Sequence, residues 1–91
     1  MIITFFGQEV ELRQPSTKRV LDLRRLDSEN PGMAAAEMII NYVYEPGTKN
    51  LVFESTDSDM ILGLPFGDDM SRMNQAIGEL TNIDVKAEIK N

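Results

Sequence analysis

One nearly uncharged segment, residues 33–44, constrains the fold more than any other part of this sequence. It reads MAAAEMIINYVY, and only Glu37 and Asn41 interrupt its apolar and aromatic residues. The apolar residues recur at helical spacing, which predicts a helix that is apolar on almost every side. We expect this helix to be either central in the fold or half covered by a partner. Its three consecutive alanines would let another element approach closely.

The beginning of the chain predicts a β-hairpin with strands over residues 2–6 and 9–13. Gly7 and Gln8 form the expected turn, because Gly supplies the positive φ that the first position of a type II′ turn requires. This turn sets the pairs Phe6 with Glu9, Phe5 with Val10, and Ile3 with Leu12. The apolar members then share one face. Since a lone hairpin is marginal in water, that face must pack against a helix.

Caps and helix breakers predict three further helices. Ser16 can cap a helix that runs to about Asp27, ahead of the turn-rich residues 28–32. A short helix after residue 55 stops before Pro65, since the residue preceding a proline avoids the α region. Asp68 caps a last helix that ends over residues 81–84. Its apolar stripe consists of Met70, Met73, Ile77 and Leu80.

Together these elements predict an α+β fold, with an N-terminal β-hairpin packed against a bundle of about four α-helices. A chain of 91 residues is near the lower end of what folds unaided. We therefore expect a single domain over residues 1–84. Residues 85–91 alternate charged with small apolar side chains and are expected to form a frayed tail.

The chain contains no His and no Cys, which excludes Ser-His-Asp triads, thiolate nucleophiles and most transition-metal sites. Paired carboxylates could still serve acid–base catalysis, and the candidates are Asp57 with Asp59 and Asp68 with Asp69. Both pairs begin predicted helices, where carboxylates complement the helix dipole, so we interpret them as structural. We expect no catalytic residue, no metal and no cofactor, and hence no enzyme.

The charge balance bears on partners. A net charge of −6 and a pI of about 4.5 argue against binding to phosphate backbones, so we expect no nucleic-acid partner. No run approaches the roughly 20 apolar residues of a membrane-spanning helix, and we expect no membrane partner. An acidic surface suits a basic protein partner, or simply keeps a small protein soluble.

Several segments resemble the small tail assembly chaperones of long-tailed (siphovirus-type) bacteriophages. The likeness covers roughly residues 5–84. It rests on the order of packing and turn residues, with no catalytic signature among them. The segments are FGQEVELRQP at 6–15, YVYEPG at 42–47, TDSD at 56–59, LGLPF at 62–66 and the closing helix at 69–84 with ELTNI at 79–83.

The resemblance implies a role in tail morphogenesis. Members of this family bind the tape-measure protein before the tail tube polymerises, keep it soluble and help bring tail-tube subunits to it. They typically self-associate, need no cofactor and leave as the tube grows. For this chain the resemblance therefore implies a homo-oligomer in the host bacterial cytoplasm that is absent from the mature virion.

We expect Met38, Tyr42, Met70 and Met73 to contribute to a protein interface, because methionine-rich helix faces make deformable contact surfaces. The Met70 and Met73 stripe also fits a core-facing side. Tyr42 and Tyr44 cannot both face one core from a helix, so we expect one of them to be buried and the other to lie at a rim.

Three other functions remain open at this point. A small acidic inhibitor of a host nucleic-acid enzyme would crowd carboxylates on one face in imitation of phosphates. A minor structural tail protein would be found in purified virions. An enzyme that uses carboxylates alone would need an acid with a raised pKa in a pocket, and no residue is a candidate for that role.

Overall fold

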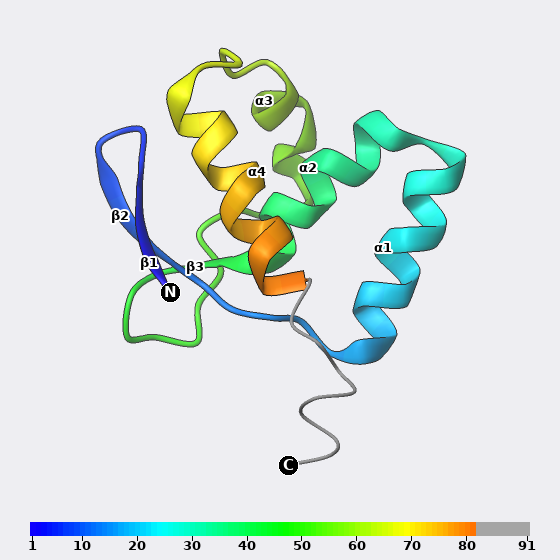
Figure 1. The fold of residues 1–91 in the computed structure, drawn as a ribbon, viewed down its shortest axis with the longest axis horizontal. Helices are drawn as coiled ribbons and strands as arrows, with labels where there is room; N and C mark the ends of the chain where they lie inside the picture. Colours follow the sequence, from blue (N-terminus) through cyan, green and yellow to red (C-terminus); the bar gives the residue numbers. More distant parts are fainter. Residues whose placement is uncertain (82–91) are drawn as a thin grey trace.

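The computed structural model describes residues 1–81 and contains a three-stranded antiparallel sheet with helices packed beside it (Figure 1). This confirms the predicted α+β class, with an N-terminal hairpin and four α-helices. The predicted helix end beyond residue 81 and the predicted tail over 85–91 lie outside the described residues. The elements are β1 (Ile2–Phe5), β2 (Gln8–Leu12), α1 (Thr17–Glu29), α2 (Pro31–Tyr42), β3 (Val43–Tyr44), the 3₁₀ helix η1 (Ser55–Asp57), α3 (Ser58–Leu62) and α4 (Asp68–Thr81).

The hairpin forms, but its predicted turn and register are wrong. Phe5 pairs with Gln8, so the turn consists of Phe6 and Gly7, with φ angles of 49° and 82°. Positive φ at both central residues is the type I′ pattern, which matches strand twist better than ordinary turns do. Phe5 was expected opposite Val10, two residues further on. Because side chains alternate with a period of two, this even shift preserves the predicted apolar face.

That apolar face is buried as expected. Phe5, Val10 and Leu12 are all nearly inaccessible, and Ile3 is half-buried against them. The sheet order is β1-β2-β3, so β2 is the central strand. The sheet thus covers one side of the helices with the face that the sequence pattern identified.

The predicted helix over residues 33–44 is displaced by two residues at both ends. Pro31 occupies its first turn, where the fixed φ of proline suits a helix start, and the Asn30 side chain accepts a hydrogen bond from the Met33 amide. At the other end, Val43 and Tyr44 leave the helix and pair with β2. Tyr42 is buried and Tyr44 half-buried, as expected for the two tyrosines.

Helix α1 begins as predicted, with the Ser16 hydroxyl accepting a hydrogen bond from the Arg19 amide. It continues to Glu29, two residues beyond the expected end, because Asn30 alone separates α1 from α2. The turn-rich residues 28–32 therefore serve two adjoining helix ends. The two helices pack side by side.

Helix α2 is central in the fold, which resolves the alternative left open by its sequence. It packs against α1, α3 and α4 and runs through the middle of the molecule (Figure 1). Its smallest residues make these close approaches, since Ala34 and Ala36 are fully buried. None of the helices within residues 1–81 is long and apolar enough to cross a membrane.

Helix α4 is joined to the outer strand of the hairpin by two polar contacts. The Arg72 guanidinium donates a hydrogen bond of 3.1 Å to the Thr4 carbonyl, and the Phe6 amide donates one of 3.2 Å to the Asp69 carboxylate. Asp69 and Arg72 also form an ion pair of 3.2 Å. These contacts hold the N-terminal half of α4 against β1.

Candidate functional site

The structure places the four residues of the expected interface mostly inside the molecule. Tyr42 is 1% exposed, Met73 is 0% exposed and Met70 is also buried, while Met38 is half-buried against the same core. All four lie in or against one hydrophobic cluster, as the core-facing interpretation of the methionine stripe requires. They offer a partner little surface.

Tyr42 is further fixed by its hydroxyl group. The Thr81 hydroxyl donates to the Ile77 carbonyl, and the Tyr42 hydroxyl lies 2.8 Å from the same Thr81 oxygen. The Thr81 oxygen therefore accepts a hydrogen bond from the Tyr42 hydroxyl. An aspartate at Tyr42 or Met73 would place an unpaired charge in the core, so it would test folding rather than association.

One group of exposed apolar side chains belongs to α3 and the segment after it, and another lies within residues 1–6. Met60 and Leu62 are about half exposed, and Phe66 is 78% exposed, the largest value among the exposed large hydrophobic residues described. The sequence analysis treated Pro65 as the stop of a short helix and used residues 62–66 only as part of the family resemblance. The missed signal was the run Leu-Gly-Leu-Pro-Phe, which carries three large apolar residues and no polar one from the end of α3 into the connection that follows.

Local structure explains why Phe66 faces outward. Helix α3 ends at Gly63, whose amide donates to the Asp59 carbonyl, and buried Ile61 anchors the helix to the core. The Gly67 amide then donates to the Pro65 carbonyl across a tight turn. Phe66 is the central residue of that turn.

Beside Phe66 lies a shallow groove between α2, α3 and α4, here called the Phe66 groove. Its volume is about 160 Å³. An apolar cavity on the order of 150 Å³ is large enough for a benzene-sized group. The groove therefore has room for one large apolar side chain of another molecule. It is lined by Ala35, Ala36, Ile39, Ile61, Leu62, Leu64, Phe66, Met70 and Asn74.

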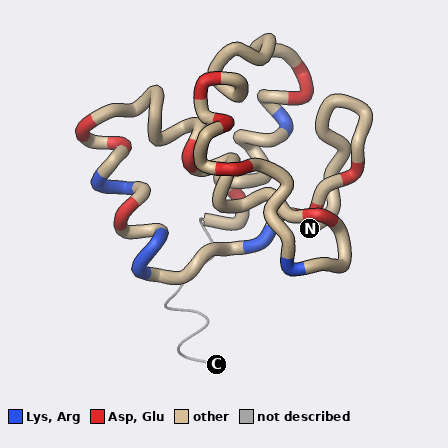
Figure 2. The backbone as a smooth tube through the Cα atoms, turned by 180° about the vertical axis from the view of Figure 1, so that it is seen from behind, with Lys and Arg blue, Asp and Glu red and all other residues tan. Residues whose placement is uncertain are grey.

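Acidic residues dominate the part of the chain that forms the groove. Between Arg25 and Arg72 the sequence has Lys49 as its one basic residue and nine acidic residues. Figure 2 shows basic and acidic residues alternating along α1, whereas acidic residues predominate around α3 and the start of α4. The acidic residues are Asp27, Glu29, Glu37, Glu45, Glu54, Asp57, Asp59, Asp68 and Asp69.

One acid of each carboxylate pair considered as a catalytic candidate has a structural partner. Asp57 accepts a hydrogen bond of 2.8 Å from the Glu54 amide, and Asp69 accepts from Phe6 and Arg72. Asp68 is the first residue of α4. Within residues 1–81, no group of three or more acidic side chains converges in a way that could hold a metal ion.

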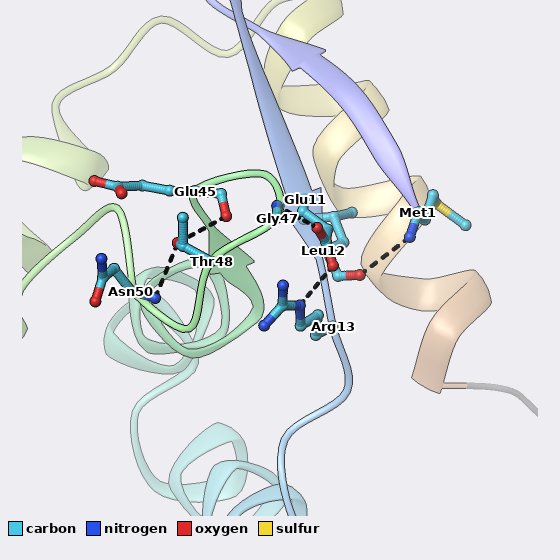
Figure 3. A network of polar contacts seen from close by, with 8 residues as sticks. All are labelled: Met1, Glu11, Leu12, Arg13, Glu45, Gly47, Thr48 and Asn50. Atoms are coloured by element: carbon cyan, nitrogen blue, oxygen red, sulfur yellow. Dashed lines mark hydrogen bonds and ion pairs between the residues drawn. The ribbon is translucent and has the colours of Figure 1, made fainter.

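A polar network at the sheet end contains Glu11 (Figure 3). The Arg13 guanidinium donates to one oxygen of Glu11, and the Gly47 amide donates to the other at 3.0 Å. These two donors lower the pKa of Glu11 from 4.5 to about 2. The lowered pKa favours a permanently charged carboxylate, which suits a structural tie and not proton transfer.

The same network closes the loop between β3 and residue 51. Arg13 also lies 4.8 Å from the centre of the Tyr44 ring, and the Thr48 hydroxyl joins the Glu45 carbonyl to the Asn50 amide. The N-terminal amine donates to the Leu12 carbonyl. We interpret this end of the molecule as part of the scaffold.

Comparisons with known proteins point to no functional site in this chain. No protein-family model matches the chain, and neither the curated proteins nor the solved structures give a match. The Phe66 groove is therefore the candidate functional site on the strength of its own geometry.

Proposed function

We propose that this protein is a phage tail assembly chaperone that binds the tape-measure protein, keeps it soluble and helps recruit tail-tube subunits. The proposal combines the resemblance seen in the sequence with the surface seen in the structure. In this proposal it acts as a homo-oligomer in the host bacterial cytoplasm and leaves before the virion matures. No step of this role requires a cofactor.

The observation that carries the proposal is the exposure of Phe66 beside an apolar groove. Phe66 is 78% exposed, and covering a large aromatic side chain with another protein stabilises the complex. Exposed apolar patches mark binding surfaces in soluble proteins. A helical client can place its own apolar residues in such a groove, which is a common mode of peptide recognition.

Co-expression with fragments of a tape-measure protein tests this function. The wild-type chain should raise the soluble fraction of at least one fragment, and Phe66→Ser should remove most of that gain. Leu21→Ser is the matched control, because Leu21 is also an exposed apolar residue, at 54%, but does not line the groove. No gain across several fragments that together span the tape-measure protein would contradict the proposed function.

A second candidate is an acidic inhibitor of a host nucleic-acid enzyme. The observation in its favour is the excess of acidic residues between Arg25 and Arg72. Carboxylates that imitate phosphates explain the charge but not the exposed Phe66. Inhibition of a purified host nuclease or polymerase that survives Phe66→Ser but is lost on neutralising Asp59 and Asp68 would favour this candidate.

A further inference from the structure

We propose that the partner segment taken by the Phe66 groove is a cationic amphipathic helix, with an apolar stripe and Lys or Arg on either side of it. This inference rests on the proposed function and specifies the chemistry of the client. It follows from the groove and from the charges around it, which make separate demands on the partner.

The shape of the site requires an apolar stripe on the partner. The groove has room for about one large side chain, and Leu62 and Phe66 extend its apolar wall into solvent. A helix lying across the surface would insert one anchor residue and cover these two with neighbours at spacings of three and four. A segment without an apolar stripe would leave Phe66 exposed.

The acidic residues on the elements that form the groove favour positive charge on the partner. Asp59 lies in α3, three residues before Leu62, and Asp68 follows Phe66 by two residues at the start of α4. Both are exposed, while Asp69 is already paired with Arg72. A helix seated against Phe66 would bring its flanking residues close to Asp59 and Asp68. Lys or Arg at those positions would be attracted, and Asp or Glu would be repelled.

The same charges argue against a second copy meeting this surface with its own groove. Each chain carries a net charge of −6, and residues 50–71 include five acidic residues and no basic one. Two such surfaces placed face to face would oppose like charges across an apolar contact. A cationic partner avoids this repulsion.

Three synthetic peptides of about 18 residues, roughly 27 Å long as helices, separate these demands. The first carries Leu on one face and Lys on the other, the second replaces Lys by Glu, and the third scrambles the first. Titration calorimetry against the full chain should show the first peptide binding at least about tenfold more tightly than either control, which is the scale of one good anchor or charge contact. Raising the salt concentration should weaken it.

Variants of the full chain locate the binding. Phe66→Ser should weaken the first peptide about tenfold, and the double variant Asp59→Lys with Asp68→Lys should do the same. Glu79→Lys is a control that reverses one charge, against two in the double variant, and it lies eleven residues after Asp68 on α4, about 16 Å along the helix. It should change affinity less than about twofold, because charges this far apart are largely screened. Circular dichroism verifies that each variant is folded.

Several outcomes would overturn the inference. Equal binding of the Lys and Glu peptides would show that the partner needs no positive charge. Equal binding of the scrambled peptide would show that it needs no apolar stripe. Sedimentation that shows self-association lost in Phe66→Ser assigns the groove to a second copy instead. If tape-measure fragments are rescued while the Lys peptide fails to bind, this inference fails and the proposed function stands. If the Lys peptide binds while no tape-measure fragment is rescued, the proposed function fails and the inferred chemistry of the bound segment stands.

Discussion

The sheet end of the molecule, where β2 pairs with β3, and the segment from α3 to Phe66 differ in how far the chain buries its apolar side chains. At the sheet end, Leu12 and Val43 face each other in adjacent strands and are almost completely buried. Glu11 and Arg13 tie the loop at Gly47 to β2. In the segment from α3 to Phe66, buried Ile61 fixes the helix, but Met60, Leu62 and Phe66 remain exposed.

This difference separates stability from binding within one small protein. Leu12 and Val43 at the sheet end are covered by the chain itself, so they stabilise the fold and have little surface for a partner. Those around Phe66 add little to stability because solvent still reaches them. Paired substitutions of the same chemical type, one in each region, can break or sharpen this contrast.

The largest difference is expected from truncating one leucine in each region. Leu12→Ala should lower the free energy of unfolding by about 2–5 kcal/mol, because Leu12 is 1% exposed and its loss leaves a cavity. Leu62→Ala should cost less than about 1 kcal/mol, since half of that side chain is already in water. Urea denaturation followed by circular dichroism measures both. Similar losses would show that the α3 segment is as firmly packed as the sheet.

A smaller difference is expected from adding a methyl group to one glycine in each region. Gly47 has φ of 74°, a left-handed conformation that costs alanine about 1 kcal/mol. Gly63 has φ of −82°, and an added Cβ would meet carbonyl oxygens at an ordinary 3.5 Å. Gly63→Ala should therefore be neutral or slightly stabilising. Thermal unfolding midpoints compare the two, and a larger loss at Gly63 would reverse the contrast.

The charged tie at the sheet end predicts a pH dependence. The pKa of Glu11 is about 2 in the folded chain and near 4.5 without its partners, so the folded state favours the carboxylate. Its contribution is fully present above pH 4.5 and is lost as the pH falls toward 2. Wild type should therefore exceed Glu11→Gln in stability at pH 6, and this gap should close below pH 3. A gap independent of pH would show that the charge of Glu11 is irrelevant.

The smallest effect on stability is expected at Phe66. Phe66→Ser should change the free energy of unfolding by no more than about 0.5 kcal/mol, because the side chain is 78% exposed. Differential scanning calorimetry should give nearly coincident curves for the two proteins. A loss above about 2 kcal/mol would place Phe66 in the core and remove the basis for a binding role.

The fold class followed from patterns that tolerate local error. The hairpin prediction misplaced the turn, because it required positive φ only at Gly7, whereas Phe6 also adopts it. The buried face was still identified, since the register differed by two residues. The end of α2 was missed because Val43 and Tyr44 suit both a helix and a strand, and only pairing with β2 distinguishes the two.

The candidate site was harder to predict, and the reason is burial. Periodicity marks apolar stripes but does not say whether the same chain covers them, so Tyr42 and Met73 were assigned to an interface while the structure buries them. Phe66 has no periodicity to reveal it, because it lies in a turn. Its exposure follows from the local hydrogen bond between Gly67 and Pro65 and from the packing of the neighbouring helices, neither of which periodicity reports.

The two contacts from α4 to the hairpin occupy backbone groups on the outer edge of the sheet. In an antiparallel pair alternate residues turn their backbone groups outward, and Met1 bonds to Leu12, so those of Thr4 point away from β2. The Arg72 guanidinium donates a hydrogen bond to the Thr4 carbonyl, and the Asp69 carboxylate accepts one from the Phe6 amide. A neighbouring strand would find two backbone groups of this edge already hydrogen-bonded. The occupied groups therefore disfavour strand pairing between copies of the chain along β1.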